Sequence, residues 1–164
     1  MASTITASTL KVTIQEDIKL NGVQQGGLNT LSIESINEVS KRIVTIPSES
    51  AHELINCSGS IGMGSYVTSS LKYVRISNLN SDADQGSVNL VFRNYDNDEF
   101  AVKVDYGQSF LYPGSAADGV SGSMDAIHSG GTAVLAQDSM NDLKRIIAHA
   151  TGSNVDLEIF TAST

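Results

Sequence analysis

Residues Lys72–Gly114 read KYVRISNLNSDADQGSVNLVFRNYDNDEFAVKVDYGQSFLYPG, in which short runs of alternating apolar and polar residues are separated by polar turns. Such a period of two places successive side chains on opposite faces of a β-strand. The apolar members of the two clearest runs are Val88, Leu90 and Phe92, then Phe100, Val102, Val104 and Tyr106. Asn and Asp residues between the runs favour turns. The stretch is therefore predicted to form the middle of an antiparallel sheet.

The segment Leu10–Leu20 alternates in the same way and is followed by Asn21-Gly22, the strongest short signal for a β-hairpin. Val23 begins the expected return strand, which Gly26-Gly27 weakens or bulges. Glu16 falls on the apolar face of the first strand. Because an inward charge is one device that protects the edge of a sheet, we expect this strand at or near an edge.

Two segments, Ile36–Ile46 and Met140–Ala150, fit either a strand or one face of a helix. The first ends in a β-branched run followed by proline, which favours a strand. For the second, the turn formers Thr151–Asn154 and the clear strand Val155–Thr161 favour a strand that turns into the last one. Phe160 falls on the polar face of that last strand, facing a loop or another subunit.

About eight strands at spacings near ten residues, without a convincing long helix, predict an all-β protein. The favoured architecture is an antiparallel β-sandwich of the jelly-roll type. An immunoglobulin-like sandwich is the alternative, although the Trp and paired Cys of antibody domains are absent. We expect an N-terminal arm over residues 1–9 and a single sandwich domain over residues 10–164.

The composition narrows the classes of partner. The chain has 164 residues and a net charge of −8, which argues against a nucleic-acid partner because phosphate binding needs a basic patch. Charged residues make up only 17% of the sequence, below the usual figure of about 25%. Ser, Thr, Asn and Gly take their place, as is common in proteins whose surfaces meet other subunits. No apolar run is long enough to cross a bilayer, so a soluble protein without a membrane partner is expected.

No residue pattern indicates an active site or a cofactor, and we expect neither. His52 and Cys57 are close enough in sequence for a nucleophile pair to be conceivable, but a small buried thiol beside a surface His is the favoured reading. A zinc site would need clustered Cys and His ligands, and the sequence has no such cluster. The candidates for calcium are acidic residues of two predicted turns, for which ordinary solvated turns are the favoured reading. They are Asp82, Asp84, Asp96 and Asp98.

Four segments carry a resemblance to a known group of proteins: Tyr73–Leu79 (YVRISNL), the strand that ends Phe92-Arg93-Asn94, Asp105–Leu111 (DYGQSFL) and Val155–Phe160 (VDLEIF). In these segments the chain resembles small jelly-roll structural proteins of tailed-bacteriophage virions, especially those of marine and cyanobacterial phages. The resemblance implies a non-enzymatic structural role. It places the protein in the virion after synthesis in the host cytoplasm.

Within a virion, an acidic domain suits the outer surface of the shell better than the surface that faces packaged DNA. The expected function is that of a capsid decoration or cement protein bound to the major capsid protein or other virion proteins. It is expected to be a homo-oligomer, with a trimer favoured. The interface candidates lie in the arm, around the long Pro113–Thr132 loop and on the last strand. They are Ser3, Thr4, Ile5, Thr6, Tyr112, Pro113, Ile127, His128 and Phe160.

The alternative function is that of a tail or fibre domain that binds host carbohydrate or joins tail components. Jelly rolls that bind sugars use exposed aromatic side chains, which stack on the sugar rings. In this sequence the aromatic residues expected to point outward are Phe160 and Tyr95.

Overall fold

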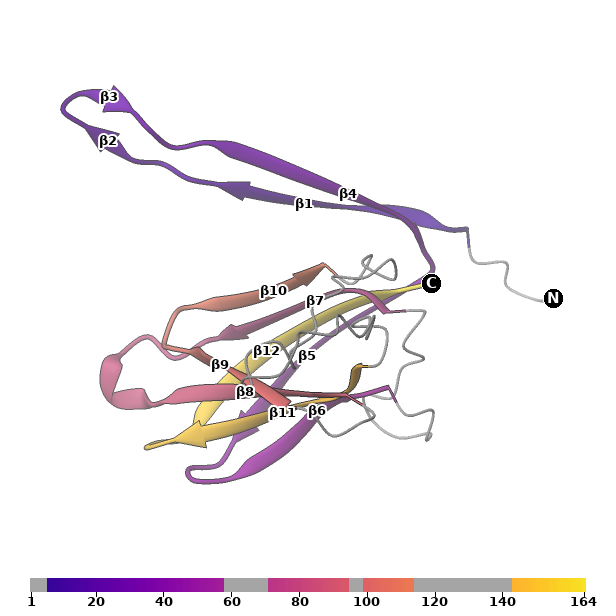
Figure 1. Ribbon diagram of the computed structural model, residues 1–164, viewed down its shortest axis with the longest axis vertical. Coiled ribbons are helices and arrows are strands. Elements are labelled where there is room, and N and C mark those ends of the chain that lie inside the picture. Colours follow the sequence, from indigo (N-terminus) through magenta and orange to yellow (C-terminus); the bar gives the residue numbers. More distant parts are fainter. Residues whose placement is uncertain (1–5, 58–70, 95–98, 114–142) are drawn as a thin grey trace, which may run out of the picture.

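A computed structural model of the chain describes residues 6–57, 71–94, 99–113 and 143–164 (Figure 1). These residues form twelve β-strands and one short 3-10 turn, Ala83–Gln85, so the predicted all-β class is confirmed. Eight strands make two four-stranded antiparallel sheets that pack face to face as a sandwich, and the other four make a hairpin that projects from it (Figure 1). No helix within the described ranges has the length and apolar character to cross a membrane.

The first sheet has the strand order β10-β7-β12-β5, and the second has the order β6-β11-β8-β9. The strands of the first sheet are β5 (Glu38–Ile46), β7 (Leu71–Asn78), β10 (Ser109–Pro113) and β12 (Val155–Ser163). Those of the second are β6 (Ala51–Asn56), β8 (Ser87–Asn94), β9 (Glu99–Val104) and β11 (Leu143–Thr151).

The pairing of these eight strands is nested. β5 pairs with β12, β6 with β11, β7 with β10 and β8 with β9, all antiparallel. The strands of the first half thus meet those of the second half in reverse order. Two further pairings, β12 with β7 and β11 with β8, complete the two sheets.

The prediction that Lys72–Gly114 forms the middle of a single sheet is wrong. The loop of residues 79–86 carries the chain from β7 in one sheet to β8 in the other, and the turn of residues 105–108 carries it back from β9 to β10. Both sheets turn their apolar faces toward one core, so strands of either sheet show the same alternation. The pattern therefore could not reveal which sheet each strand joins.

In the described residues the two ambiguous segments are strands, apart from Asn37, which separates β4 from β5. Ile36–Ile46 contains β5, and Met140–Ala150 contains most of β11. The expected hairpin between β11 and β12 does not form, because the turn at residues 152–154 takes the chain from one sheet to the other. β11 instead lies between β6 and β8, and β12 lies between β7 and β5.

Phe92 lies in the core between the two sheets and is 1% exposed. Its ring stacks on that of Phe100 with centroids 4.6 Å apart, and it meets the tilted ring of Phe110 at 5.0 Å. Phe92 and Phe100 belong to the second sheet and Phe110 to the first. This aromatic cluster therefore joins the two layers of the sandwich.

The projecting hairpin consists of β1 (Ser8–Gln15) and β4 (Leu28–Ile36), with the short strands β2 (Lys19–Leu20) and β3 (Val23–Gln24) at its tip. Asn21 and Gly22 form the turn with φ angles of 50° and 81°, the left-handed conformation that a tight hairpin turn requires and that Asn-Gly adopts readily. The predicted hairpin is confirmed. Its predicted place at an edge is also confirmed, because β1 pairs only with β4 in a two-stranded sheet that is separate from the sandwich sheets.

Candidate functional site

The hairpin shifts register once at its base, between Ser8 and Leu10, and keeps one register from Leu10 to its tip. Val12 lies opposite Leu31, and Leu20 lies opposite Val23. Between these pairs, Glu16 N donates to the Gly27 carbonyl at 2.8 Å, and Gln25 N donates to the Ile18 carbonyl at 2.9 Å. These bonds set Glu16 opposite Gly27 and Ile18 opposite Gln25, which continues the same pairing. Residues directly opposite each other in an antiparallel pair share a face, so the two faces of the hairpin can be followed along its whole length.

One face of the hairpin carries most of its apolar side chains, which are Leu10, Val12, Ile14, Ile18, Leu20, Val23, Leu31 and Ile33. The same face also carries the charged Glu16, with Asn29 opposite Ile14, Gly27 opposite Glu16 and Gln25 opposite Ile18. The other face is polar, as shown by the contact of the Thr13 and Thr30 hydroxyls at 3.4 Å and the bond from Gln24 Nε2 to Asp17 Oδ1 at 3.0 Å. Leu28 is the large apolar residue on that second face. We call the first face the apolar hairpin face.

The base of the apolar hairpin face packs on the outside of the first sheet. Ile33 and Ile36 form a buried cluster with Tyr73 of β7 and Ala162 of β12, and Leu10, Val12, Leu111 and Phe160 pack against it. The Phe160 ring meets that of Tyr73 edge to face, with centroids 5.9 Å apart. Burial raises the pKa of Tyr73. Phe160 thus lies on the outer face of its strand, and the hairpin base of the same chain packs on it.

Beyond the base, the apolar hairpin face is uncovered. Its large side chains from Leu31 outward are between 40% and 59% exposed. They are Ile14, Ile18, Leu20, Val23 and Leu31. Figure 1 shows this part of the hairpin standing clear of both sheets. A row of exposed apolar side chains of this kind is typical of surfaces that contact another molecule.

A second uncovered apolar strip lies on β5, an edge strand of the first sheet. Val39 and Ile43 point outward and are 56% and 62% exposed. Lys41 lies between them on the same face. The alternate residue Arg42 points the other way, where its guanidinium donates to the Leu54 carbonyl of the second sheet.

Glu158 connects this edge to the hairpin base on the outer face of the first sheet. One carboxylate oxygen accepts from Lys41 Nζ at 2.8 Å, and the other accepts from the Arg75 guanidinium. Arg75 also lies over the Phe160 ring, 5.8 Å from its centroid. The bond from Lys41, assisted by the charges of both cations, lowers the pKa of Glu158 from its ordinary value of 4.5.

This lowered pKa predicts a pH dependence of stability. A carboxyl whose pKa is depressed by folding stabilises the native state above its unfolded pKa and loses that contribution as the pH falls through its folded pKa. We expect Glu158→Gln to melt a few degrees below the natural protein at about pH 7, and the difference to vanish by about pH 2. Thermal melts across this range, with Glu34→Gln on β4 as an exposed control, test it. A difference in melting temperature that is constant with pH would contradict the assignment.

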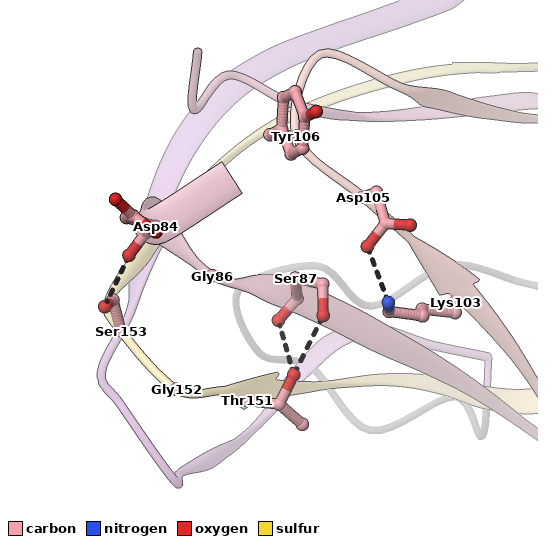
Figure 2. Close-up of a pocket in the computed structure, with 9 residues that line it drawn as sticks. All are labelled: Asp84, Gly86, Ser87, Lys103, Asp105, Tyr106, Thr151, Gly152 and Ser153. Carbon is pink, nitrogen blue, oxygen red and sulfur yellow. Dashed lines mark hydrogen bonds and ion pairs between the residues drawn. The ribbon is translucent and has the colours of Figure 1, made fainter. Parts of the chain in front are cut away.

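A polar hollow of about 410 Å³ lies at one end of the sandwich (Figure 2). It is formed by the start of β8, the end of β9 and the turns that follow β9 and β11. Its lining residues are Asp84, Gly86, Ser87, Lys103, Asp105, Tyr106, Thr151, Gly152 and Ser153. Lys103 Nζ lies 2.8 Å from Asp105 Oδ1, the Ser87 and Thr151 hydroxyls are 2.9 Å apart, and Ser153 Oγ donates to the Asp84 carbonyl at 3.1 Å.

The chemistry of this hollow is that of hydrogen bonding. Hydroxyls, carboxylates and one ammonium line it, and Figure 2 shows Tyr106 at its rim. The prediction that Tyr106 continues the apolar face of β9 is wrong, because the strand ends at Val104 and Tyr106 is 45% exposed in the following turn. The Tyr106 ring therefore lies exposed beside the polar lining of the hollow.

The metal and nucleophile candidates are separated or exposed in the described structure. Asp82 and Asp84 are exposed on the loop between β7 and β8, and Asp96 and Asp98 lie outside the described residues. The described ranges contain no group of three or more His, Cys, Asp or Glu placed to hold a metal ion. Cys57 is buried in the core, whereas His52 is exposed on β6.

The remaining interface candidates are only partly described. Thr6 is exposed just before β1, and Tyr112 on β10 packs its half-buried ring against the sandwich core, where burial raises its pKa. Pro113 is the last residue of β10. Ser3, Thr4, Ile5, Ile127 and His128 lie outside the described residues, as does Tyr95.

Comparisons of the chain with protein-family models, with curated proteins and with solved structures found no match.

Proposed function

We propose that this protein is a non-enzymatic structural component of a virion, a decoration or cement protein that binds the outer surface of a tailed-phage shell. The observation that carries the proposal is the projecting hairpin, whose apolar face extends beyond a sandwich that already has a buried core. A contact that removes apolar surface from water is stabilised by the hydrophobic effect. The uncovered face therefore suits a protein that buries its remaining apolar surface against neighbouring subunits in an assembly.

The fold and the charge support this proposal further. The nested pairing of eight strands in two four-stranded sheets is the arrangement expected of a jelly roll, an architecture that viral capsid proteins use. The net charge of −8 favours a place away from packaged nucleic acid. The proposed partners are the major capsid protein or other virion proteins, together with further copies of this chain.

The stoichiometry of purified particles tests the proposal. Quantitative mass spectrometry of virions that contain this chain is expected to give a copy number comparable with that of the major capsid protein. Added back to shells that lack it, the purified protein should saturate the outer surface and raise the temperature at which the shells open. Absence from particles would overturn the virion role, and a copy number of only a few would move the protein to the tail.

The hollow of Figure 2 favours a second candidate function, a tail or fibre domain that binds host carbohydrate. Tyr106 offers a ring for stacking, and Asp84 and Asp105 offer acceptors for sugar hydroxyls. Binding to a glycan array, lost in Tyr106→Ala and in Asp105→Asn, would support this function. An array without signal, together with a high copy number in particles, would remove it.

A further inference from the structure

We propose that the apolar hairpin face of one copy of this chain packs on the outer face of β5 of a second copy, with Glu16 of the hairpin opposite Lys41 of the sheet. This self-association is a property of the isolated protein. It goes beyond the proposed virion role and does not depend on it.

The two surfaces carry matching patterns. On the hairpin, Ile14, Glu16 and Ile18 share one face at every second residue. On β5, the outward residues at the same spacing are Val39, Lys41 and Ile43. Side chains two residues apart on a strand are separated by about 7 Å, so both surfaces repeat the order apolar, charged, apolar over the same length. The central charges have opposite sign.

The groups at the centre of this contact remain able to pair. The Lys41 side chain is 60% exposed even though Nζ lies 2.8 Å from Glu158. An ammonium has three donors, and the other oxygen of Glu158 is held by Arg75. Lys41 can therefore donate to a second carboxylate and keep Glu158. A charged pair at the centre of an apolar contact fixes its register and excludes partners of the wrong charge.

The hairpin of the same chain packs its base on β7 and β12 and leaves the outward side chains of β5 exposed. The buried cluster at its base holds Ile33 and Ile36 against Tyr73 and Ala162. From there the ladder continues in one register to the tip, which stands away from the sandwich in Figure 1. Val39 and Ile43 of the same chain stay exposed in this arrangement. The outer face of β5 is therefore open to the hairpin of a second copy.

The size of the two strips suits a contact between folded proteins. Five branched side chains of the hairpin and two of β5 are each close to half exposed or more. Together, on the two partners, they present on the order of several hundred Å² of apolar surface, a large share of the apolar part of a standard interface that buries about 1,600 Å² in total. Because the two strips differ, the contact runs from head to tail. It closes as a pair that exchanges hairpins or as a small ring.

Charge exchange tests the proposal on the full-length protein in solution. The natural chain is expected to form a closed oligomer, measured by light scattering after size exclusion. Glu16→Lys and Lys41→Glu are each expected to weaken association by about tenfold or more, because like charges then face each other. The double variant Glu16→Lys with Lys41→Glu should recover most of the affinity. Thermal melting of each variant establishes that the sandwich is folded.

A matched pair of apolar variants tests the face of the hairpin. Leu20→Lys places a charge on the apolar hairpin face and should give monomers, whereas Leu28→Lys on the opposite face should leave the oligomer intact. A natural chain that stays monomeric at the highest attainable concentration, equal effects of these two variants, or no recovery in the charge-exchanged double variant would overturn the proposal. The shell-binding proposal is judged separately, by adding monomeric Lys41→Glu protein, whose apolar hairpin face is unchanged, to undecorated shells.

Discussion

Phe92→Ala is expected to destabilise the sandwich by about 3–5 kcal/mol, the usual cost of removing a large aromatic side chain from a packed core. Phe92 is 1% exposed and its ring touches those of Phe100 and Phe110. Because these rings come from both sheets, the cavity would open where the two layers meet. For a chain of this length the melting temperature should fall by roughly 10 °C or more.

Denaturant unfolding followed by fluorescence and circular dichroism measures this loss. Tyr106→Ala is the control, since an exposed ring in a turn should contribute within about 0.5 kcal/mol. The expected loss for Phe92→Ala is a large share of the total stability of an ordinary domain, about 5–15 kcal/mol. A loss below about 1 kcal/mol would show that Phe92 is not packed as described.

Gly26→Ala is expected to break the hairpin between its base and its tip while leaving the sandwich folded. A Cβ at this position would overlap the backbone carbonyl of Glu16 on the facing strand and lie 3.1 Å from Asp17 N. The two strands must separate to make room, which disrupts the bonds between Glu16 and Gly27 and between Ile18 and Gln25. The outer half of the apolar hairpin face then loses its shape.

The neighbouring residue provides a matched control. A Cβ on Gly27 would meet only the Glu16 carboxylate oxygen, at an ordinary distance of 3.9 Å, so Gly27→Ala should be tolerated. Hydrogen exchange measures the difference: amides of residues 16–27 should exchange about tenfold faster or more in Gly26→Ala, while β11 and β12 stay protected. Equal protection in the two variants would contradict the close approach at Gly26.

The sequence predicted the sandwich strands well because each has one face against the core. The alternation of Val88, Leu90 and Phe92 identified β8, and the β-branched end of Ile36–Ile46 identified β5. Partners were harder to predict. Nothing local distinguishes a turn that folds a strand back onto its neighbour from one that crosses to the other sheet, as residues 152–154 do. Pairings over long separations depend on the packing of the whole sandwich.

The candidate site was predicted only in part for a related reason. Asn21-Gly22 predicted the hairpin. The alternation in Leu10–Leu20 suggested that the apolar face of this strand would be buried, as the apolar faces of the other strands are. Alternation says that a face is apolar and does not say what covers it. Ile18 and Leu20 are apolar for the same pattern reason as Ile33, yet only Ile33 is buried within the chain. The neighbours of Phe160 and Tyr106 likewise could not be predicted without the fold.

The nested pairing has a consequence for how the protein is made. β12 pairs with both β5 and β7, and β11 pairs with both β6 and β8. Neither four-stranded sheet can therefore be completed until residues 143–163 have been synthesised. Contacts between segments so far apart in sequence form slowly, and until they form the unpaired strands expose their backbone edges. The hairpin of residues 8–36 is local and can pair early in synthesis, and its base becomes buried once β7 and β12 are in place. Its tip would then be ready for a neighbour while the sandwich behind it is still assembling.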